Sequence, residues 1–411
     1  MPAGFSEEGL AALDAALERQ VKRGEVPGLV ALVARGGQVH VTTCGHKTLG
    51  DSEPIGRDAI FRIASLTKPI VGAAAMLLIE DGAMALDDPV SRWLPELAGR
   101  RVLRSLESGL DDTVPAEREI TVEDALSFRL GFGCIMTPGT FPVAAAEERV
   151  GLKTLGPPWP PTALTPDQWI AGLGRLPLLD QPGQRWRYNT GATVAGILIE
   201  RVTGTPLAEV LAKRVFEPLG MTDTGFYVPE AKLHRFTSMY WPEADGLTQY
   251  DAPGGWYAAP PALPDGASGL VSTIDDCWEF TSMLADGGGR LLSPESVRLM
   301  LRDRTTDQDK ADHPMFFGGN SGWGLMMAVP ASYDAPAGSS PSGTPGPSDT
   351  PGTPADGVPR GYGWDGGSGT TWRTDPATGL TGILLTQRMM MSPEPPQVTG
   401  AFWSTARAAF T

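Results

Sequence analysis

Residues 61–97 read FRIASLTKPIVGAAAMLLIEDGAMALDDPVSRWLPEL, and they form the most informative stretch of the chain. A short β-like run, Ala59–Ile63, ends just before Ser65. An apolar run at helical spacing continues from there to Glu80, where an acidic residue and a glycine end it. We therefore expect a strand to give way to a buried helix at Ser65.

Strand-like and helical segments are distributed unevenly along the rest of the chain. Strands are expected near both ends, at Leu29–Ala34, Gln38–Thr43, 322–329, 369–373 and 380–387. Helices are expected at 6–23, 119–128, 166–175, 191–216, 273–286, 293–302 and 397–409, and strand signals are scarce in the middle. The simplest packing lets the two ends share one sheet. We predict an α+β fold, with a mainly antiparallel sheet flanked by helices and an inserted, mostly helical domain.

This pattern also predicts the domain boundaries. The sheet domain would be discontinuous, comprising residues 1–84 and 263–411, and the helical domain would span 85–262. Residues 331–360 consist mainly of Ala, Gly, Ser, Pro and Thr. Such a composition cannot bury a core, so we expect a flexible loop between two strands with no catalytic role.

Composition and charge exclude several classes of partner. The chain has 411 residues and a formal net charge of −15, so nucleic acid and anionic membranes would repel it. No window approaches the length of a membrane span, and the first residues do not resemble a signal peptide, so we expect a cytoplasmic protein. The three cysteines and four histidines lack metal-ligand spacing, and we expect neither a metal nor a cofactor. The oligomeric state is not predicted.

The first chemical signal is the S-x-x-K motif of Ser65 and Lys68. Residues three apart on a helix share a face, so the lysine amine can reach the serine hydroxyl. A serine is a weak nucleophile that needs a neighbouring base, and a lysine without water around it loses affinity for its proton. Taken alone, the motif fits a helix-capping serine beside a surface lysine equally well.

Two further stretches carry polar or glycine-rich signals. Tyr188 and Asn189 precede a helix, and a tyrosine beside a lysine cation can ionise below its usual pKa and relay protons. Trp364 opens the run WDGGSG, in which glycines let the backbone approach a ligand and an N–H near Gly367 could complete an oxyanion hole. Judged singly, a half-buried core tyrosine and a turn with a packed tryptophan explain these stretches better.

In this order the three motifs resemble the serine β-lactamase and penicillin-binding protein superfamily. More narrowly, the chain is similar to the class C-like carboxylesterases of family VIII and their acyltransferase relatives. The similarity extends through three long blocks, 61–97, 182–226 and 266–280. It implies a serine carboxylesterase that hydrolyses short-chain or aryl esters, with acyl transfer to an alcohol as a further activity.

The resemblance also implies a role for each motif residue. Ser65 would be the nucleophile and Lys68 its hydrogen-bonded partner, with Tyr188 as general base in acylation and as acid toward the leaving group. Trp364 stands where β-lactamases carry a lysine or histidine, and Gly367 lies beyond it on the oxyanion strand. Gly366 and Asn189 complete the expected set of oxyanion and substrate-binding residues.

Two departures from the family's pattern point away from β-lactams. Thr190 replaces the asparagine that helps to orient a β-lactam's amide side chain. Where the family has a cation that would meet the carboxylate of a β-lactam, Trp364 offers a broad apolar surface. Both changes favour uncharged esters over charged lactams.

Three other functions compete with this one. A β-lactamase or a D-amino-acid-specific peptidase or amidase of the same superfamily is the alternative enzyme. A binding protein that kept the fold and lost the chemistry is disfavoured by the intact Ser65, Lys68 and Tyr188. An α/β-hydrolase needs a G-x-S-x-G motif, and no serine in the sequence has glycine at both −2 and +2.

Overall fold

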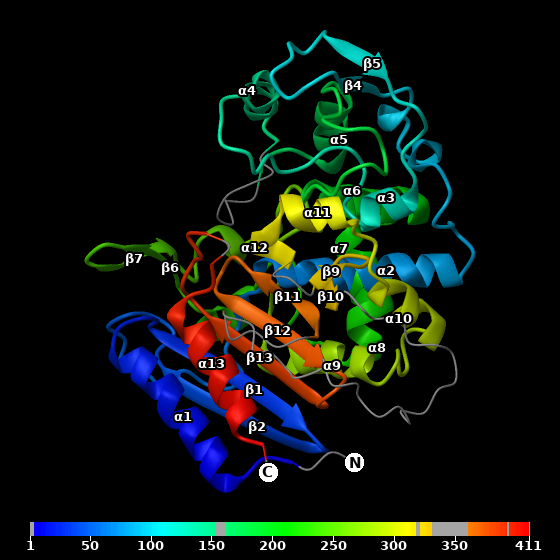
Figure 1. Cartoon of the computed structure of the whole chain (residues 1–411). Coiled ribbons are helices and arrows are strands. Elements are labelled where there is room, and N and C mark those ends of the chain that lie inside the picture. The colour runs from blue at the N-terminus through cyan, green and yellow to red at the C-terminus, as the bar shows by residue number, and fades with distance from the viewer. Residues whose placement is uncertain (1–3, 153–161, 318–320, 331–360, 393, 411) are drawn as a thin grey trace.

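A computed structural model describes residues 4–152, 162–317, 321–330, 361–392 and 394–410. Its centre is a seven-stranded antiparallel sheet with the strand order β2-β1-β13-β12-β11-β10-β9 (Figure 1). The strands are β1 (Gly28–Arg35), β2 (Gln38–Gly45), β9 (Ser321–Trp323), β10 (Ala328–Pro330), β11 (Tyr362–Gly366), β12 (Thr370–Asp375) and β13 (Leu380–Thr386). The predicted fold class is confirmed, and strands from both ends of the chain meet where β1 pairs with β13.

Strand β1, second in the strand order, is buried on both faces. Leu29, Ala31 and Val33 face a core built with α1 (Glu7–Lys22) and α13 (Gln397–Ala408). The alternate residues, such as Val30 and Leu32, belong to the larger core on the opposite face. Because successive side chains of a strand point to opposite faces, this continuous apolar run requires a layer of helices on each side.

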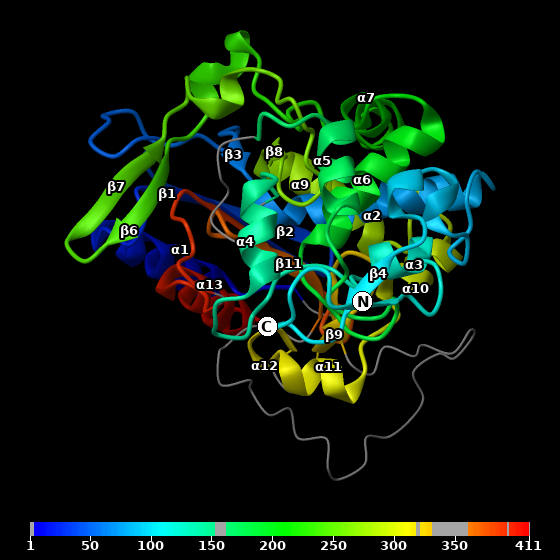
Figure 2. The same cartoon turned by 90° about the horizontal axis from the view of Figure 1, so that it is seen from above.

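The helices of the larger core cover the other face of the sheet and rise above it (Figures 1 and 2). In chain order they are α2 (Thr67–Glu80), α3 (Val122–Leu126), α4 (Pro142–Arg149), α5 (Pro166–Gly174), α6 (Thr190–Thr203), α7 (Leu207–Leu211), α8 (Glu217–Leu219), α9 (Ile274–Ala285), α10 (Pro294–Leu301) and α12 (Pro314–Phe317). The short helix α11 (Asp307–Asp312) lies next to α12. Helix α2 is buried along nearly its whole length, so it forms the axis of this core.

Several predicted elements differ from those observed. The expected helix 191–216 is divided into α6, α7 and a π-helical turn at Ala212–Phe216, because Gly204 adopts a left-handed conformation and Pro206 follows it. The expected strand 322–329 is two strands, β9 and β10, joined by a turn in which Met326 has a φ of 69°. A positive φ cannot continue a strand, and the chain reverses there.

The strand expected before Ser65 is shorter than predicted and lies outside the main sheet. It is β3 (Phe61–Arg62), which pairs with β8 (Val271–Ser272) in a separate two-stranded sheet. The middle of the chain also contains two small hairpins that the sequence analysis did not predict. Their strands are β4 (Arg101–Leu103), β5 (Thr113–Pro115), β6 (Met239–Glu243) and β7 (Gly246–Asp251).

The domain boundaries at 84/85 and 262/263 stay a prediction. The loop predicted at 331–360 lies outside the described residues. Among the helices of the described ranges, none is both long enough and apolar enough to cross a membrane. The described residues also contain no group of three or more His, Cys, Asp or Glu side chains arranged to hold a metal ion.

Candidate active site

Ser65 lies in a tight turn between β3 and α2. The turn is a 3₁₀-helix, Ala64–Leu66, and Ala64 has a positive φ of 44°, which is rare for a residue with a side chain. The segment around Leu270 holds the turn in place. Its N–H donates to the Thr67 hydroxyl at 3.1 Å, and its carbonyl accepts the Ile63 N–H at 3.0 Å. The half-buried serine is thus presented on a strained but anchored backbone.

Lys68 is fully buried in the first turn of α2 and points back at the serine. Its Nζ donates hydrogen bonds to Ser65 Oγ at 2.8 Å and to the Ala267 carbonyl at 2.7 Å. Burial lowers the pKa of the lysine from 10.5 to about 7, while the charge of Asp265 works in the opposite direction. Near neutral pH a large fraction of this amine is therefore unprotonated and able to accept a proton.

Tyr188 reaches the same serine from the other side. Its hydroxyl donates to Ser65 Oγ at 3.0 Å, and its ring centroid lies 4.7 Å from Lys68 Nζ. The structure thus brings together three residues that the sequence separates by up to 123 positions. The backbone before the tyrosine is held by residues 128–134, since Phe128 O accepts the Arg187 N–H at 2.7 Å and the Cys134 N–H donates to Tyr188 O at 3.0 Å.

The expectation of a lowered pKa for Tyr188 is wrong in this structure. Burial raises the pKa of the phenol well above its usual value, and the hydrogen bonds with Ser65 and Trp364 only partly oppose that effect. The amine beside the ring is itself buried and loses its charge near pH 7, so it offers little of the positive field that the expectation required. Tyr188 therefore rests as a neutral hydrogen-bond donor.

Asn189 forms a strained turn directly after Tyr188. Its φ and ψ are 82° and −61°, and the Thr190 N–H donates to the Tyr188 carbonyl at 3.2 Å. These values define a γ-turn with a positive central φ, which is uncommon and costs free energy. The turn reverses the chain from the tyrosine into α6. Binding of substrate by the Asn189 side chain stays a prediction.

Trp364, on β11, contacts the tyrosine rather than simply offering an apolar surface. Its Nε1 donates a hydrogen bond to the Tyr188 hydroxyl at 2.8 Å. The motif alone did not indicate this bond, although the N–H group of a buried indole usually has a hydrogen-bond partner. The Trp364 ring packs edge-on against Trp323, with centroids 4.6 Å apart.

Gly366 and Gly367 lie where β11 ends beside the nucleophile turn. A Cβ on Gly366 would overlap the Ile63 carbonyl oxygen, so glycine lets the strand pack directly on the turn that carries Ser65. The Ser368 hydroxyl fastens this contact by donating to Arg62 O at 2.5 Å. The Gly367 carbonyl accepts the Met390 N–H at 2.8 Å. The peptide groups of the expected oxyanion strand are therefore fixed against the serine turn.

An aromatic cluster surrounds Tyr188, and sequence analysis did not predict most of it. The Phe316 ring on α12 lies 5.2 Å from the Tyr188 ring and stacks against Trp364 with an interplanar angle of 18° and centroids 5.9 Å apart. The rings of Phe128 and Trp186 each lie 5.8 Å from the Tyr188 ring. Trp186 lies two residues before Tyr188, but Phe128, Phe316 and Trp364 come from segments far from it in the chain, so no local pattern could have indicated their contacts.

Comparison with known proteins identifies the family. The family described as Beta-lactamase matches residues 13–399. Protein Rv1367c of Mycobacterium tuberculosis (strain ATCC 25618 / H37Rv) is 37% identical over 89% of this chain and 86% of its own length. Esterase EstB of Burkholderia gladioli is 30% identical over 94% of this chain and 93% of its own. Among solved structures, EstCE1, described as a hydrolase with promiscuous acyltransferase activity, matches with a TM-score of 0.75 and 25% identity over 96% of this chain and 99% of that one. The resemblance inferred from the three motifs is confirmed, and the chain belongs to the β-lactamase family.

Proposed function

We propose that this protein is a serine carboxylesterase that cleaves uncharged short-chain or aryl esters through an acyl-enzyme on Ser65. The observation that carries the proposal is the convergence of Lys68 Nζ and the Tyr188 hydroxyl on one oxygen, Ser65 Oγ, at 2.8 and 3.0 Å. The relatives EstB and EstCE1, named as an esterase and a hydrolase, support an ester as the substrate.

Acylation begins with attack of Ser65 Oγ on the ester carbonyl carbon. The serine proton passes to Lys68, whose lowered pKa makes the neutral amine available near pH 7. The resemblance implies that Tyr188 takes the serine proton. We assign this proton transfer to Lys68 instead, because burial keeps the phenol of Tyr188 protonated by raising its pKa. The peptide N–H groups of Ser65 and Gly367 would stabilise the oxyanion.

Collapse of the tetrahedral intermediate requires an acid for the departing alcohol. Tyr188 would give its proton to the alkoxide as the C–O bond breaks and recover one from the Lys68 ammonium. The Trp364 indole N–H, 2.8 Å from the phenolic oxygen, would stabilise the transient phenolate. Deacylation repeats the sequence with water as the nucleophile, or with an alcohol when the acyl group is transferred.

The polarity of the site supports esters over β-lactams. Trp364 carries no charge, and its ring packs with Phe316 and Trp323 beside Tyr188, which favours apolar acyl or aryl groups. We expect nitrocefin turnover far below the turnover of p-nitrophenyl acetate. Comparable rates on the two substrates would favour the alternative, a β-lactamase or D-amino-acid-specific amidase.

The test of the nucleophile combines labelling and turnover. Intact-mass analysis should show one fluorophosphonate adduct on the wild type and none on Ser65→Ala, which should also lose hydrolysis of p-nitrophenyl esters. Ser91→Ala is the control, because the Ser91 hydroxyl donates to Glu119 at 2.5 Å and not to any residue of the site. Labelling and turnover retained in Ser65→Ala would refute the proposal.

The proposal includes a cytoplasmic location. Cys44, Cys134 and Cys277 form no disulfide bond in the structure, which fits a reducing compartment. Recovery of the protein in the soluble cytoplasmic fraction of the producing cell would support the location, and recovery outside the cytoplasm would contradict it.

A further inference from the structure

Helix α11 contacts the segment that leads into Tyr188 through one buried carboxylate. Asp309 is 2% exposed and is the third residue of α11, which Thr306 caps. Its Oδ1 accepts the Trp186 N–H at 2.9 Å, although the two residues are 123 positions apart. The remaining oxygen, Oδ2, accepts the Thr306 N–H and hydroxyl, each at 2.9 Å. The carboxylate thus joins a helix end to the backbone two residues before the tyrosine.

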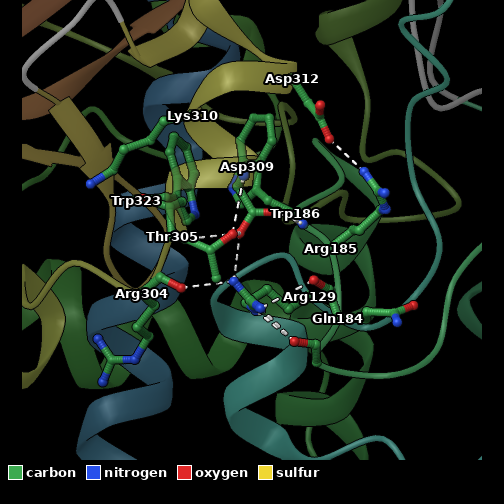
Figure 3. Close-up of polar contacts among 12 residues, drawn as sticks. Arg129, Gln184, Arg185, Trp186, Arg304, Thr305, Asp309, Lys310, Asp312 and Trp323 are labelled. Carbon is green, nitrogen blue, oxygen red and sulfur yellow. Dashed lines mark hydrogen bonds and ion pairs between the residues drawn. The ribbon is translucent and has the colours of Figure 1, made fainter.

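Arg129 neutralises this carboxylate and contacts the same segment. Its Nη1 donates to Asp309 Oδ2 at 2.6 Å and to the Arg304 carbonyl at 2.9 Å, while its Nε donates to the Gly183 carbonyl at 3.0 Å (Figure 3). The Arg129 side chain is only 13% exposed, so little solvent screens the pair. Together, Arg129 and Asp309 hold the chain at Gly183 and at Trp186.

These contacts hold the backbone directly before the tyrosine. Tyr188 comes two residues after Trp186, and the strained γ-turn at Asn189 comes next. A strained turn persists only when its surroundings determine it, and the turn cannot fix the tyrosine by itself. Helix α12 adds packing from the same side, since the rings of Trp186 and Phe317 lie 4.8 Å apart.

We infer that Asp309 is a positioning residue for Tyr188, and that with Arg129 it sets the distance between the phenolic oxygen and Ser65 Oγ. Asp309 acts through the backbone of Trp186 and touches no reacting atom. This inference rests on the proposed function, because it needs Tyr188 to move protons during acylation. Displacing a reacting group by about 1 Å can cost on the order of 100-fold in rate.

The chain offers a closely matched control in Asp276. This residue is also the third residue of a threonine-capped helix, α9, and it is 6% exposed. Its Oδ2 accepts the Asp223 N–H at 2.8 Å and the Thr224 hydroxyl at 2.7 Å. It therefore serves a similar structural purpose, and in the described part of the chain its hydrogen bonds go to residues other than 183–188.

The experiment measures the acylation rate constant with benzyl acetate in single-turnover mode, because its alkoxide leaving group needs a proton, together with KM and thermal unfolding. Asp309→Ala should lower acylation on the order of 10- to 100-fold with little change in KM. Asp276→Ala should lower the unfolding temperature by a comparable amount and leave acylation within about two-fold, because its hydrogen bonds go to Asp223 and Thr224 and not to the segment before Tyr188.

A conservative variant distinguishes the effect of the hydrogen bond to Trp186 from the effect of the negative charge of Asp309. It also keeps the test valid if Asp309→Ala does not fold. Asp309→Asn keeps an oxygen that can accept the Trp186 N–H, so its acylation should lie between those of the wild type and Asp309→Ala. Wild-type acylation in both Asp309 variants, or an equal loss in Asp276→Ala, would overturn the inference.

A Tyr188→Phe variant measured alongside distinguishes the two proposals. Loss of acylation in Tyr188→Phe with full acylation in Asp309→Ala would reject only the positioning role. Full acylation in Tyr188→Phe would reject the proposed proton transfer itself.

Discussion

The Trp364 indole N–H donates a 2.8 Å hydrogen bond to the hydroxyl of Tyr188, and that hydroxyl in turn donates to Ser65 Oγ at 3.0 Å. The phenol is therefore oriented from both sides, with its proton directed at Ser65 Oγ. By resemblance, β-lactamases carry a lysine or histidine at this position, whose charge would meet the carboxylate of a β-lactam. Tryptophan has no such charge, and its N–H is a neutral hydrogen-bond donor. Under the proposed function, the same residue would affect both proton transfer and substrate choice.

Replacing Trp364 with phenylalanine should weaken acylation without destroying the site. The variant keeps an aromatic ring for packing but loses the hydrogen bond to Tyr188. Loss of one such bond corresponds to about a 10-fold lower kcat/KM for benzyl acetate, whose alkoxide leaving group needs the proton of Tyr188. Steady-state kinetics with this ester test the prediction, and an unchanged kcat/KM would show that the bond has no part in the rate-determining step.

Esterase activity should rise with pH around neutrality. The pKa of Lys68 is lowered to about 7, and only its neutral form can take the serine proton. The acylation rate should therefore increase as pH rises through about 7 and level off above it. Single-turnover rates between pH 5.5 and 9 provide the measurement, and a rate that falls over this range would contradict the assignment of Lys68 as the base.

The same buried amine should lower the stability of the wild type in a pH-dependent way. Its pKa is about 7 in the folded protein, against 10.5 as its ordinary value, so between these pH values the unfolded chain binds more protons. The free energy of unfolding should therefore gain up to about 1.4 kcal/mol per pH unit as pH rises through this window.

Lys68→Met removes that titration. Its stability advantage over the wild type should be largest near pH 7 and shrink toward pH 10. Urea denaturation of both proteins at pH 7, 8.5 and 10 measures the difference between their free energies of unfolding. The contributions of the other titrating groups cancel in this difference. A difference that does not vary with pH would contradict burial of a titrating amine at this position.

Phe316 should limit the size of the acyl or alcohol group. Its half-buried ring stacks on Trp364 and lies 5.2 Å from the Tyr188 ring, at the edge of the site. Phe316→Ala should raise the ratio of kcat/KM for p-nitrophenyl octanoate to kcat/KM for p-nitrophenyl acetate by about 10-fold. The contact of a single methylene group with an apolar pocket changes kcat/KM by about this factor or more. A panel of acyl lengths tests this, with Met315→Ala as the control, since Met315 is 64% exposed. An unchanged ratio would place Phe316 outside the substrate pocket.

Gly366→Ala should abolish esterase activity through the nucleophile turn. The added methyl group would overlap the Ile63 carbonyl oxygen, which is backbone and cannot move away cheaply. We expect activity to fall by about 100-fold or more, as β11 and the Ser65 turn separate. Gly400→Ala is the matched control, because a Cβ at that glycine meets no atom within 4 Å. Equal activity in the two variants would refute the close packing.

Local patterns were enough to predict much of the fold and part of the site. The spacing of Ser65 and Lys68 placed the hydroxyl and the amine on one face because helical periodicity fixes neighbours three residues apart. Likewise, the apolar run of β1 indicated a buried strand, although its pairing with β13 depends on residues some 350 positions away. The divided helix after Thr203 shows the limit of periodicity, since the left-handed Gly204 ended a pattern that otherwise continued.

The sequence by itself determined which residues could do the chemistry: a serine, a lysine and a tyrosine in motifs of recognisable order. Only the tertiary structure decided how they would do it. Burial, which no motif encodes, lowered the pKa of Lys68 and raised that of Tyr188, and so favours the amine as the base. The bonds from Trp364 to Tyr188 and from Trp186 to Asp309 likewise join segments more than 100 residues apart. Distances of that kind depend on how the whole core packs, whereas a motif records only what lies within a few residues.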